Sequence, residues 1–255
     1  MPVTTDVSEG LGVLTLDNPN QRNALSTQAM NEIIAGLQNL SEAESAGCII
    51  INARGPVFSS GHDLREMIGR GIEEKHSIFE LCNVMMETIQ QLRQPVIAAV
   101  QGPAMAAGCQ LVATCDMAIA SDSAVFSTPG VKIGLFCSTP MVAVTRAIGR
   151  KRALQMLLTG EPVSAATAAD WGLINEVVSP ESLDLRVREL GKQVSAASSM
   201  TLRVGKQAFY KQADLPQPEA YAEMAEVMAT NALADDAQEG MGAFLEKRTP
   251  VWRNH

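Results

Sequence analysis

The chain has 255 residues, a formal net charge of −8, and 46% hydrophobic but only 4% aromatic residues. This length predicts one large domain or two small ones, with enough chain to bury a core. The acidic balance, without a run of Lys or Arg, argues against nucleic acid or an anionic membrane as a partner. A small anionic ligand would need a local cluster of cations and backbone N–H groups.

The sequence also carries predictions about membrane spans, location and metals. Residues 94–115 form the longest stretch without charge, but Pro95, Gly102 and Pro103 interrupt it, so buried strands and turns are expected there instead of a membrane span. No basic, apolar leader is visible at the N-terminus. The five cysteines are odd in number and lack CxxC spacing. We therefore expect a protein of the reduced cytoplasm, without a disulfide framework or a metal site.

Apolar runs of strand length occur at residues 13–16, 48–51, 96–100 and 117–120. The first run alternates and the others are nearly continuous, which is typical of strands covered on both faces. Ser26 is a predicted N-cap for a helix over residues 27–40. One face of this helix carries Met30, Ile33, Ile34 and Leu37. A second stripe at helical spacing is formed by Ile78, Leu81, Met85, Ile89 and Leu92.

The second half of the chain is predicted to be mostly helical. Trp171-Gly172-Leu173 indicates a helix that ends at a glycine cap, and residues 175–178 indicate one last short strand. Further helices are predicted to begin at Leu183, Ser199, Gln217 and Asp235. Strands first and helices last predict a sheet-based core over residues 1–195 and a helical region over residues 196–255.

Three glycine-containing loops follow predicted strands, at residues 58–64, 101–110 and 126–134. Small residues allow the backbone to approach a ligand closely, and a loop that leads into a helix presents free N–H groups. Two such N–H groups directed at one oxygen would form an oxyanion hole. The alternative is that Gly and Ala are present for tight packing, and the loops alone leave both interpretations open.

The remaining residues argue against several common kinds of site. The three histidines, His62, His76 and His255, form no HxxxH or HxxH pair, so an imidazole-based metal site is not expected. Ser60, His62 and Asp63 are the residue types of a hydrolase triad, but neighbours in sequence cannot all point at one another. Neither GxxxxGKS/T nor a GxGxxG after a strand is present, so the ordinary phosphate-binding loops are absent.

A series of short segments shares its order and spacing with a known family. These segments are Asn18-Pro19, Arg22-Asn23-Ala24-Leu25, residues 58–64, 95–102, 107–109, 115–116, 158–160 and 169–173, Glu239-Gly240-Met241 and residues 243–248. In them the chain resembles the enoyl-CoA hydratase/isomerase (crotonase) family over almost its whole length. The resemblance implies an α/β fold, a spiral of ββα units with a helical C-terminal trimerisation region, and usually hexamers. It also implies an acyl-CoA thioester as ligand, with no covalently bound cofactor.

The resemblance places an oxyanion hole on the backbone N–H groups of His62 and Ala107. A thioester carbonyl that becomes an enolate gains charge on its oxygen, and two fixed donors stabilise that charge. The implied contacts to coenzyme A are Arg22, Ala24, Leu25, His62, Asp63 and Leu64, with Phe244 and Lys247 supplied by a neighbouring subunit. The alternative for Lys247 is an ordinary solvated helix end.

The chain departs from the family at two positions that matter for catalysis. A hydratase of this family uses two glutamates to add water across the double bond, and here those positions carry Gln110 and Gly130. An amide has no useful proton affinity at neutral pH and glycine has no side chain, so both acid–base positions are empty. Ordinary hydratase activity is therefore doubtful, although Gln110 could still form a hydrogen bond with substrate or water.

His62 and Cys137 are the side chains that could take part instead. The Gly-His-Asp variant around His62 resembles methylmalonyl-CoA decarboxylase, a family member that dispenses with the glutamate pair. Decarboxylation generates its own enolate, so an oxyanion hole suffices. That enzyme's tyrosine falls on Cys137, where a thiol could be a nucleophile, a weak acid or simply packing. Ser138 stands where dienoyl-CoA isomerases carry another acid, and a hydroxyl is a poor substitute.

Two functional classes therefore stay open. The first is an enzyme that acts on an acyl-CoA through an enolate or tetrahedral intermediate, by decarboxylation, isomerisation, thioester hydrolysis or slow hydration. The second is a non-catalytic acyl-CoA binder or structural subunit that has kept the fold. RNA binding, which occurs in one branch of the family, would need a basic stripe that this sequence lacks.

Overall fold

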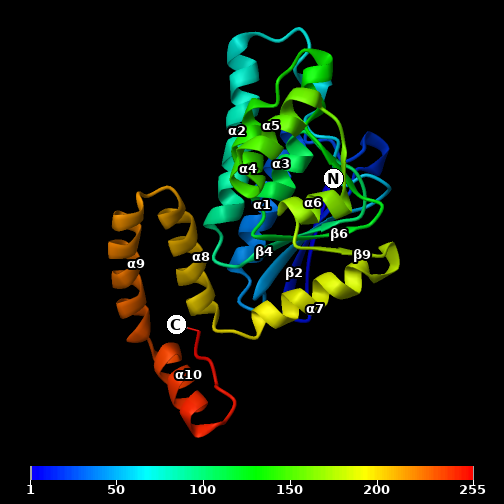
Figure 1. Ribbon diagram of the computed structural model, residues 1–255. Helices are drawn as coiled ribbons and strands as arrows, with labels where there is room; N and C mark the ends of the chain where they lie inside the picture. Colours follow the sequence, from blue (N-terminus) through cyan, green and yellow to red (C-terminus); the bar gives the residue numbers. More distant parts are fainter. Residues whose placement is uncertain (1, 255) are drawn as a thin grey trace.

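A six-stranded sheet forms the centre of the computed structural model, which describes residues 2–254 (Figure 1). In spatial order the strands are β1 (Val3–Ser8), β2 (Leu11–Leu16), β3 (Cys48–Ala53), β4 (Val96–Val100), β6 (Met117–Ser121) and β9 (Glu176–Val178). β1 and β2 pair antiparallel, and every other neighbouring pair is parallel. All four apolar runs that were predicted to be strands lie in this sheet, so those predictions are confirmed.

Helices cover both faces of the sheet (Figure 1). α1 (Thr27–Glu42), α2 (Ile72–Gln91) and α3 (Ala107–Thr114) enclose the larger core, to which Leu14, Ile49 and Ile51 contribute. α7 (Leu183–Ser195) packs on the opposite face over a smaller core that includes Val13 and Ile50. Successive strand residues therefore enter different cores, which explains why their sequences are almost continuously apolar.

A second, three-stranded sheet brings the glycine loops together. It consists of β5 (Ala104–Met105), β7 (Val125–Ser127) and β8 (Val163–Ser164). Ala104 pairs with Phe126 on β7, and an isolated bridge joins Ser59 to Ala104. The three loops that are far apart in sequence consequently meet at one end of the larger core.

Local sequence signals explain where the helices begin and end. The Ser26 hydroxyl accepts a hydrogen bond from the Ala29 N–H (3.1 Å), which confirms the predicted N-cap of α1. α6 (Ala165–Trp171) ends at Gly172, whose φ of 87° is readily adopted by glycine. Between α3 and α6 in the chain lie α4 (Ser138–Ile148), which packs against α3, and α5 (Arg150–Thr159), which packs against α4.

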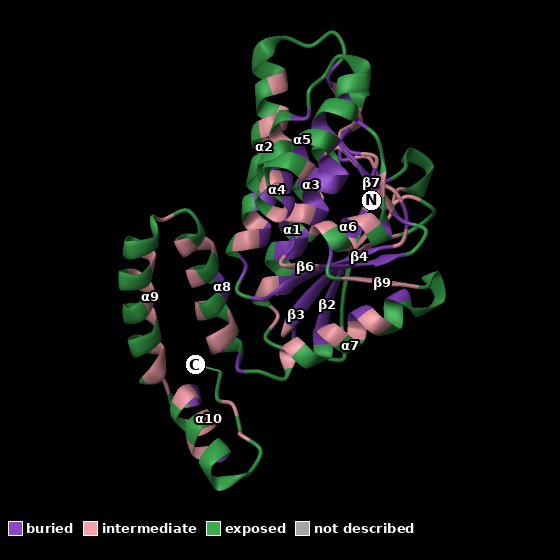
Figure 2. Ribbon diagram, in the orientation of Figure 1, coloured by how far each residue is buried: buried purple, intermediate pink, exposed green. Residues whose placement is uncertain are grey.

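Three helices, α8 (Ser199–Ala213), α9 (Gln217–Ala232) and α10 (Asp235–Glu246), extend away from the sheet (Figure 1). Their starting residues, and that of α7, agree with the sequence predictions. α9 buries none of its residues, and Figure 2 shows it as largely exposed. The predicted division of the chain after residue 195 falls at the end of α7 and stays a prediction.

Candidate active site

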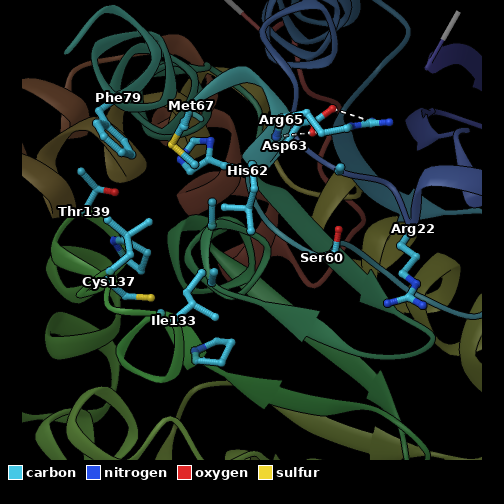
Figure 3. A pocket seen from close by; sticks show the side chains of 18 of the residues that line it. Arg22, Ser60, His62, Asp63, Arg65, Met67, Phe79, Ile133, Cys137 and Thr139 are labelled. Atoms are coloured by element: carbon cyan, nitrogen blue, oxygen red, sulfur yellow. Dashed lines mark hydrogen bonds and ion pairs between the residues drawn. The ribbon is translucent and has the colours of Figure 1, made fainter. Parts of the chain in front are cut away.

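A cavity of about 660 Å³ lies where the glycine loops converge. Its wall comes from the segment before α1, from the loop of residues 58–64, from α2, from the start of α3 and from residues 129–140. The lining residues used below are Arg22, Ala24, Ser60, His62, Asp63, Arg65, Met67, Phe79, Ala107, Gly130, Lys132, Cys137 and Thr139. Figure 3 shows His62, Met67 and Phe79 at one end and Arg22 at the other.

Several hydrogen bonds hold the loop segment that precedes His62. The Ser59 hydroxyl donates to the Asn23 carbonyl (2.8 Å) and accepts from the Gly61 N–H (3.2 Å). The Leu25 N–H donates to the Gly61 carbonyl (2.8 Å). Gly61 has a φ of +86°, and a Cβ on it would lie only 3.1 Å from the Ala107 nitrogen. Glycine is thus required here for both its conformation and its close approach.

A strained turn positions the Ala107 N–H. Ala106 has φ 50° and ψ −116°, an unfavourable conformation for a residue with a Cβ, and its N–H donates to the Ser127 carbonyl (2.8 Å). Strain of this kind typically costs about 1–3 kcal/mol and collects at functional sites. Ala107 is the first residue of α3, where a backbone N–H has no partner within the helix.

The N–H groups of His62 and Ala107 form the central pair of the site. Within residues 2–254, neither of these two N–H groups meets a hydrogen-bond acceptor, and both residues line the cavity. Since a Cβ on Gly61 would lie 3.1 Å from the Ala107 nitrogen, the two backbone segments run close beside each other. An arrangement of this type can stabilise negative charge that develops on a carbonyl oxygen.

The imidazole of His62 is the second polar feature of the cavity. Both ring nitrogens are buried and have no hydrogen-bond partner in the described part of the chain, and the ring packs edge-on against Phe79 with centroids 5.5 Å apart. Burial lowers the pKa of His62 below its ordinary value, and the Leu25 backbone and the charge of Glu66 only partly oppose this. The neutral imidazole is therefore favoured at pH 7.

Asp63 is the only carboxylate among the residues that line the described cavity, and it is already engaged. Its oxygens accept from the Arg65 guanidinium at 2.9 and 2.6 Å and from the Arg65 N–H at 3.0 Å. Figure 3 shows the Asp63 carboxylate directed toward Arg65. These bonds lower the pKa of Asp63, so it is poorly suited to act as a base.

The two positions at which the family resemblance implies acid–base residues differ in their surroundings. Gln110 is buried on α3 and is not among the lining residues, and its amide oxygen lies 4.0 Å from the Cys82 sulfur. Gly130 does line the cavity, but a Cβ on it would overlap the Leu135 carbonyl oxygen and lie 2.8 Å from the Cys137 sulfur. The turn at Gly130 therefore leaves no room for a side chain.

Cys137 faces the cavity immediately before α4. Burial raises the pKa of its thiol above the ordinary value, and the Gly130 backbone only partly offsets this effect. A thiol that stays protonated is a poor nucleophile and a weak hydrogen-bond donor. The geometry therefore favours packing or weak donation over covalent catalysis.

The residues implied as coenzyme A contacts separate into two groups. Arg22, Ala24, Asp63 and Leu64 line the cavity together with His62, whereas Leu25 is buried behind the wall. Phe244 on α10 and Lys247 just after it are exposed and do not line this cavity. A role for them would need a second copy of the chain, so it stays a prediction.

Some lining residues were not identified from the sequence as site residues, among them Phe79, Lys132 and Thr139. Phe79 lies beside the predicted apolar stripe of α2, and its position one residue after Ile78 is the only signal that the sequence offers. No group of three His, Cys, Asp or Glu in the described chain could hold a metal ion. Among residues 2–254, no helix is long and apolar enough to cross a membrane.

The sheet order, the converging glycine loops and the three C-terminal helices together make the crotonase fold. The crystal structure of enoyl-CoA hydratase from Mycobacterium smegmatis matches with a TM-score of 0.96, 42% identity and 99% coverage of each chain. The crystal structure of human enoyl-CoA hydratase domain-containing protein 3 matches with a TM-score of 0.96 and 42% identity, covering 99% of this chain and 100% of the other.

The chain belongs to the enoyl-CoA hydratase/isomerase family, whose model matches residues 6–255. Enoyl-CoA hydratase domain-containing protein 3 of Rattus norvegicus is 44% identical over 250 residues, which are 98% of this chain and 83% of that protein. The Homo sapiens protein of the same name is 43% identical over 252 residues, with coverage of 98% and 83%. Both relatives are named as mitochondrial proteins.

Proposed function

We propose that the protein binds an acyl-CoA thioester in this cavity and stabilises its enolate with the N–H groups of His62 and Ala107. The observation that carries this proposal is the pair of N–H groups that find no acceptor within residues 2–254, on two backbone segments so close that a Cβ on Gly61 would crowd the Ala107 nitrogen. Membership of the enoyl-CoA hydratase/isomerase family supports a CoA thioester as the ligand. Removing one donor from comparable sites costs roughly 3–4 kcal/mol of transition-state stabilisation.

The reaction that fits best is one in which the substrate supplies its own electron pair. In the decarboxylation of a 2-carboxyacyl thioester, the bond to the carboxylate breaks and carbon dioxide leaves. The electron pair becomes the enolate, and a solvent proton then adds to the α-carbon. No protein base is required, which suits a cavity whose one carboxylate, Asp63, is paired with Arg65. Ordinary hydration needs two acid–base groups, each worth a factor of roughly 10²–10⁴, and remains doubtful.

Non-catalytic binding of an acyl-CoA is a second candidate function. The observation that favours non-catalytic binding is that neither His62 nor Cys137 on the cavity wall is prepared to act as a base or a nucleophile. The His62 ring nitrogens accept or donate no hydrogen bond within residues 2–254, and burial keeps the Cys137 thiol protonated. A cavity with an oxyanion hole but no oriented base can bind a thioester without turning it over. Thioester hydrolysis is less well supported, because neither side chain is activated to attack or to deprotonate water.

The assembly proposed for this function is a trimer or hexamer of the chain. α9 buries none of its residues, and α9 and α10 expose large apolar side chains that a single copy leaves uncovered, namely Tyr221, Met228, Met241, Phe244 and Leu245. In such an assembly, Phe244 and Lys247 of one copy could approach the coenzyme A bound near Arg22 of another. Light scattering during size-exclusion chromatography tests this expectation. The cytoplasmic location stays a prediction.

Mass spectrometry of a CoA-thioester panel incubated with the protein in heavy water tests the reaction. Decarboxylation, hydration, thioester cleavage and α-proton exchange each produce a different mass change. Gly61→Ala and Gly69→Ala form a matched pair, because both glycines have positive φ but only Gly61 would crowd the Ala107 nitrogen. We expect Gly61→Ala to abolish turnover and Gly69→Ala to retain it. Fast hydration would contradict the proposed reaction, and tight binding without any mass change would favour the non-catalytic function.

A further inference from the structure

Fewer hydrogen bonds connect the turn after His62 to the rest of the protein than connect the segment before His62. Residues Leu64–Glu66 form one 3-10 turn on the surface, and the Asp63 carboxylate that caps this turn has Arg65 as its one hydrogen-bond partner among the described residues. Beyond Met67 the chain runs through an exposed segment to α2. Apart from the burial of Met67 and the packing of the His62 ring on Phe79, the position of this turn depends on few hydrogen bonds to the rest of the described chain.

One of these contacts reaches across 39 residues of sequence. The Oε2 atom of Glu66 accepts a hydrogen bond from the backbone N–H of Thr27 at 2.8 Å and another from the Thr27 hydroxyl at 2.8 Å. Thr27 is the first residue of α1, and its helical neighbour Ala29 is already capped by Ser26. Hydrogen bonds to an ionised carboxylate are stronger than neutral ones.

The Glu66–Thr27 link and a second link enclose His62 between them. On one side the Leu25 N–H donates to the Gly61 carbonyl (2.8 Å), and on the other Thr27 donates to Glu66. Both links start from the segment that contributes Arg22 and Ala24 to the cavity wall. The backbone of His62 is thus fixed to the same segment that would contact the nucleotide end of coenzyme A.

We propose that Glu66 is a positioning residue of the oxyanion hole, because its bonds to Thr27 hold the turn after His62 and keep the His62 N–H on the cavity wall. The consequence for a bound thioester rests on the proposed function, whereas the consequence for the loop does not. Glu66 does not itself line the cavity, so it acts through the backbone. Its charge also favours the protonated His62 ring, against the effect of burial.

A purely structural role for Glu66, as an extra cap of α1, makes different predictions. Ser26 already supplies the N-cap, so loss of Glu66 would leave α1 formed. A structural role would change global stability without a local change at residues 61–67. A positioning role would change the exchange of the amides near His62 and the polarisation of a carbonyl bound there.

The variants Glu66→Met and Thr27→Val each break the link, and Thr27 is exposed, so its replacement leaves the core unaltered. Thr27→Ser keeps the hydroxyl and is expected to behave like the wild type, whereas Glu66→Gln keeps only a neutral acceptor and is expected to fall between the wild type and Glu66→Met. Glu80→Met is the matched control, because Glu80 is an exposed carboxylate on α2 that pairs only with His76 among the described residues. Hydrogen exchange of the full-length protein, resolved at residues 58–67, is the first measurement.

We expect Glu66→Met to speed exchange at residues 61–67 by about tenfold or more, and Thr27→Val by less. The double variant is expected to match Glu66→Met, since both changes break the same link. If exchange in Glu66→Met equals that in Glu80→Met, the proposal is overturned.

The second measurement is the infrared carbonyl band of butyryl-CoA carrying ¹³C at its carbonyl, bound to each variant. In the wild-type protein, donation from two N–H groups is expected to lower the band frequency, and Glu66→Met is expected to return it part-way to the free value. Faster exchange with an unchanged band would overturn the positioning role. A wild-type band that does not shift would contradict the proposed function instead, while the exchange measurement would still test the link.

Discussion

The ammonium group of Lys206 on α8 lies 2.7 Å from the carboxylate of Asp116, and the two side chains are only 5% and 16% exposed. The Lys206 ammonium also donates to the backbone carbonyls of Ile89 and Gln94, at 2.8 and 2.9 Å. Tyr210, one turn further along α8, donates its hydroxyl to the same carboxylate at 2.7 Å. This polar cluster fastens the first C-terminal helix to the end of α2 and the start of β4.

Replacing Lys206 with Met is therefore expected to destabilise the protein by about 3–5 kcal/mol, because Asp116 would remain buried without its cation. Urea unfolding followed by circular dichroism at several protein concentrations measures the change. Lys211→Met is the control, since Lys211 is an exposed lysine of the same helix that pairs with Glu223. A loss below 1 kcal/mol for Lys206→Met would show that the cluster does not hold α8 in place.

Substitutions at two glycines test whether the turn at Gly130, beside the cavity, can accommodate a side chain. Gly130→Ala is expected to lower the free energy of unfolding by roughly 1–3 kcal/mol, because the new Cβ would overlap the Leu135 carbonyl oxygen. Gly205→Ala, in open space on α8, is expected to raise it by about 0.5–1 kcal/mol. Equal effects in the two variants would mean that residues 130–135 move aside easily.

Burial of His62 predicts a specific dependence of stability on pH. Because the pKa of His62 is lowered on folding, the unfolded chain binds more protons than the folded one just below pH 6.5. Stability then rises with pH through this window and falls on acidification from pH 7 to 5. The contribution of one such group is at most about 1.4 kcal/mol per pH unit.

His62→Gln should remove this contribution, and His76→Gln changes an exposed histidine as the control. Urea unfolding between pH 5 and 7.5 is the measurement. A steeper pH dependence in His62→Gln than in His76→Gln would show that the imidazole is charged in the folded protein.

The raised pKa of Cys137 predicts slow alkylation at neutral pH. Iodoacetamide labelling of Cys137, followed by peptide mass spectrometry, is expected to accelerate steeply only above pH 9. Saturating acyl-CoA should protect this thiol because it faces the cavity. Rapid labelling at pH 7 that does not change with pH would reveal a thiolate and would revive covalent catalysis by Cys137.

Much of the fold was predictable because its signals are local. Ser26 marks the start of α1, Gly172 marks the end of α6, and apolar runs mark the central strands. β5 and β8 have only two residues each, which is too short for any periodicity to indicate them. These short strands nevertheless bring the glycine loops together, so the convergence itself could be expected only from the family resemblance.

The backbone of the site was easier to predict from the sequence than the orientation of its side chains. Gly61 and the Ala106–Ala107 pair indicated close backbone approach, which the structure shows. Gln110 lies almost one turn after Ala107, and whether it faces the cavity depends on how α3 packs against α2. Here Cys82 of α2 lies beside its amide. Such a rotation is decided by packing between helices that are distant in sequence.

The closed turn at Gly130 also has a consequence for protein engineering. Laboratory evolution usually proceeds by single substitutions that each leave a folded protein. A glutamate introduced at position 130 would meet the Leu135 carbonyl before its carboxylate could serve any reaction. A route to water-adding activity in this scaffold would therefore have to begin with a change that reopens residues 131–137, and only afterwards install the acid.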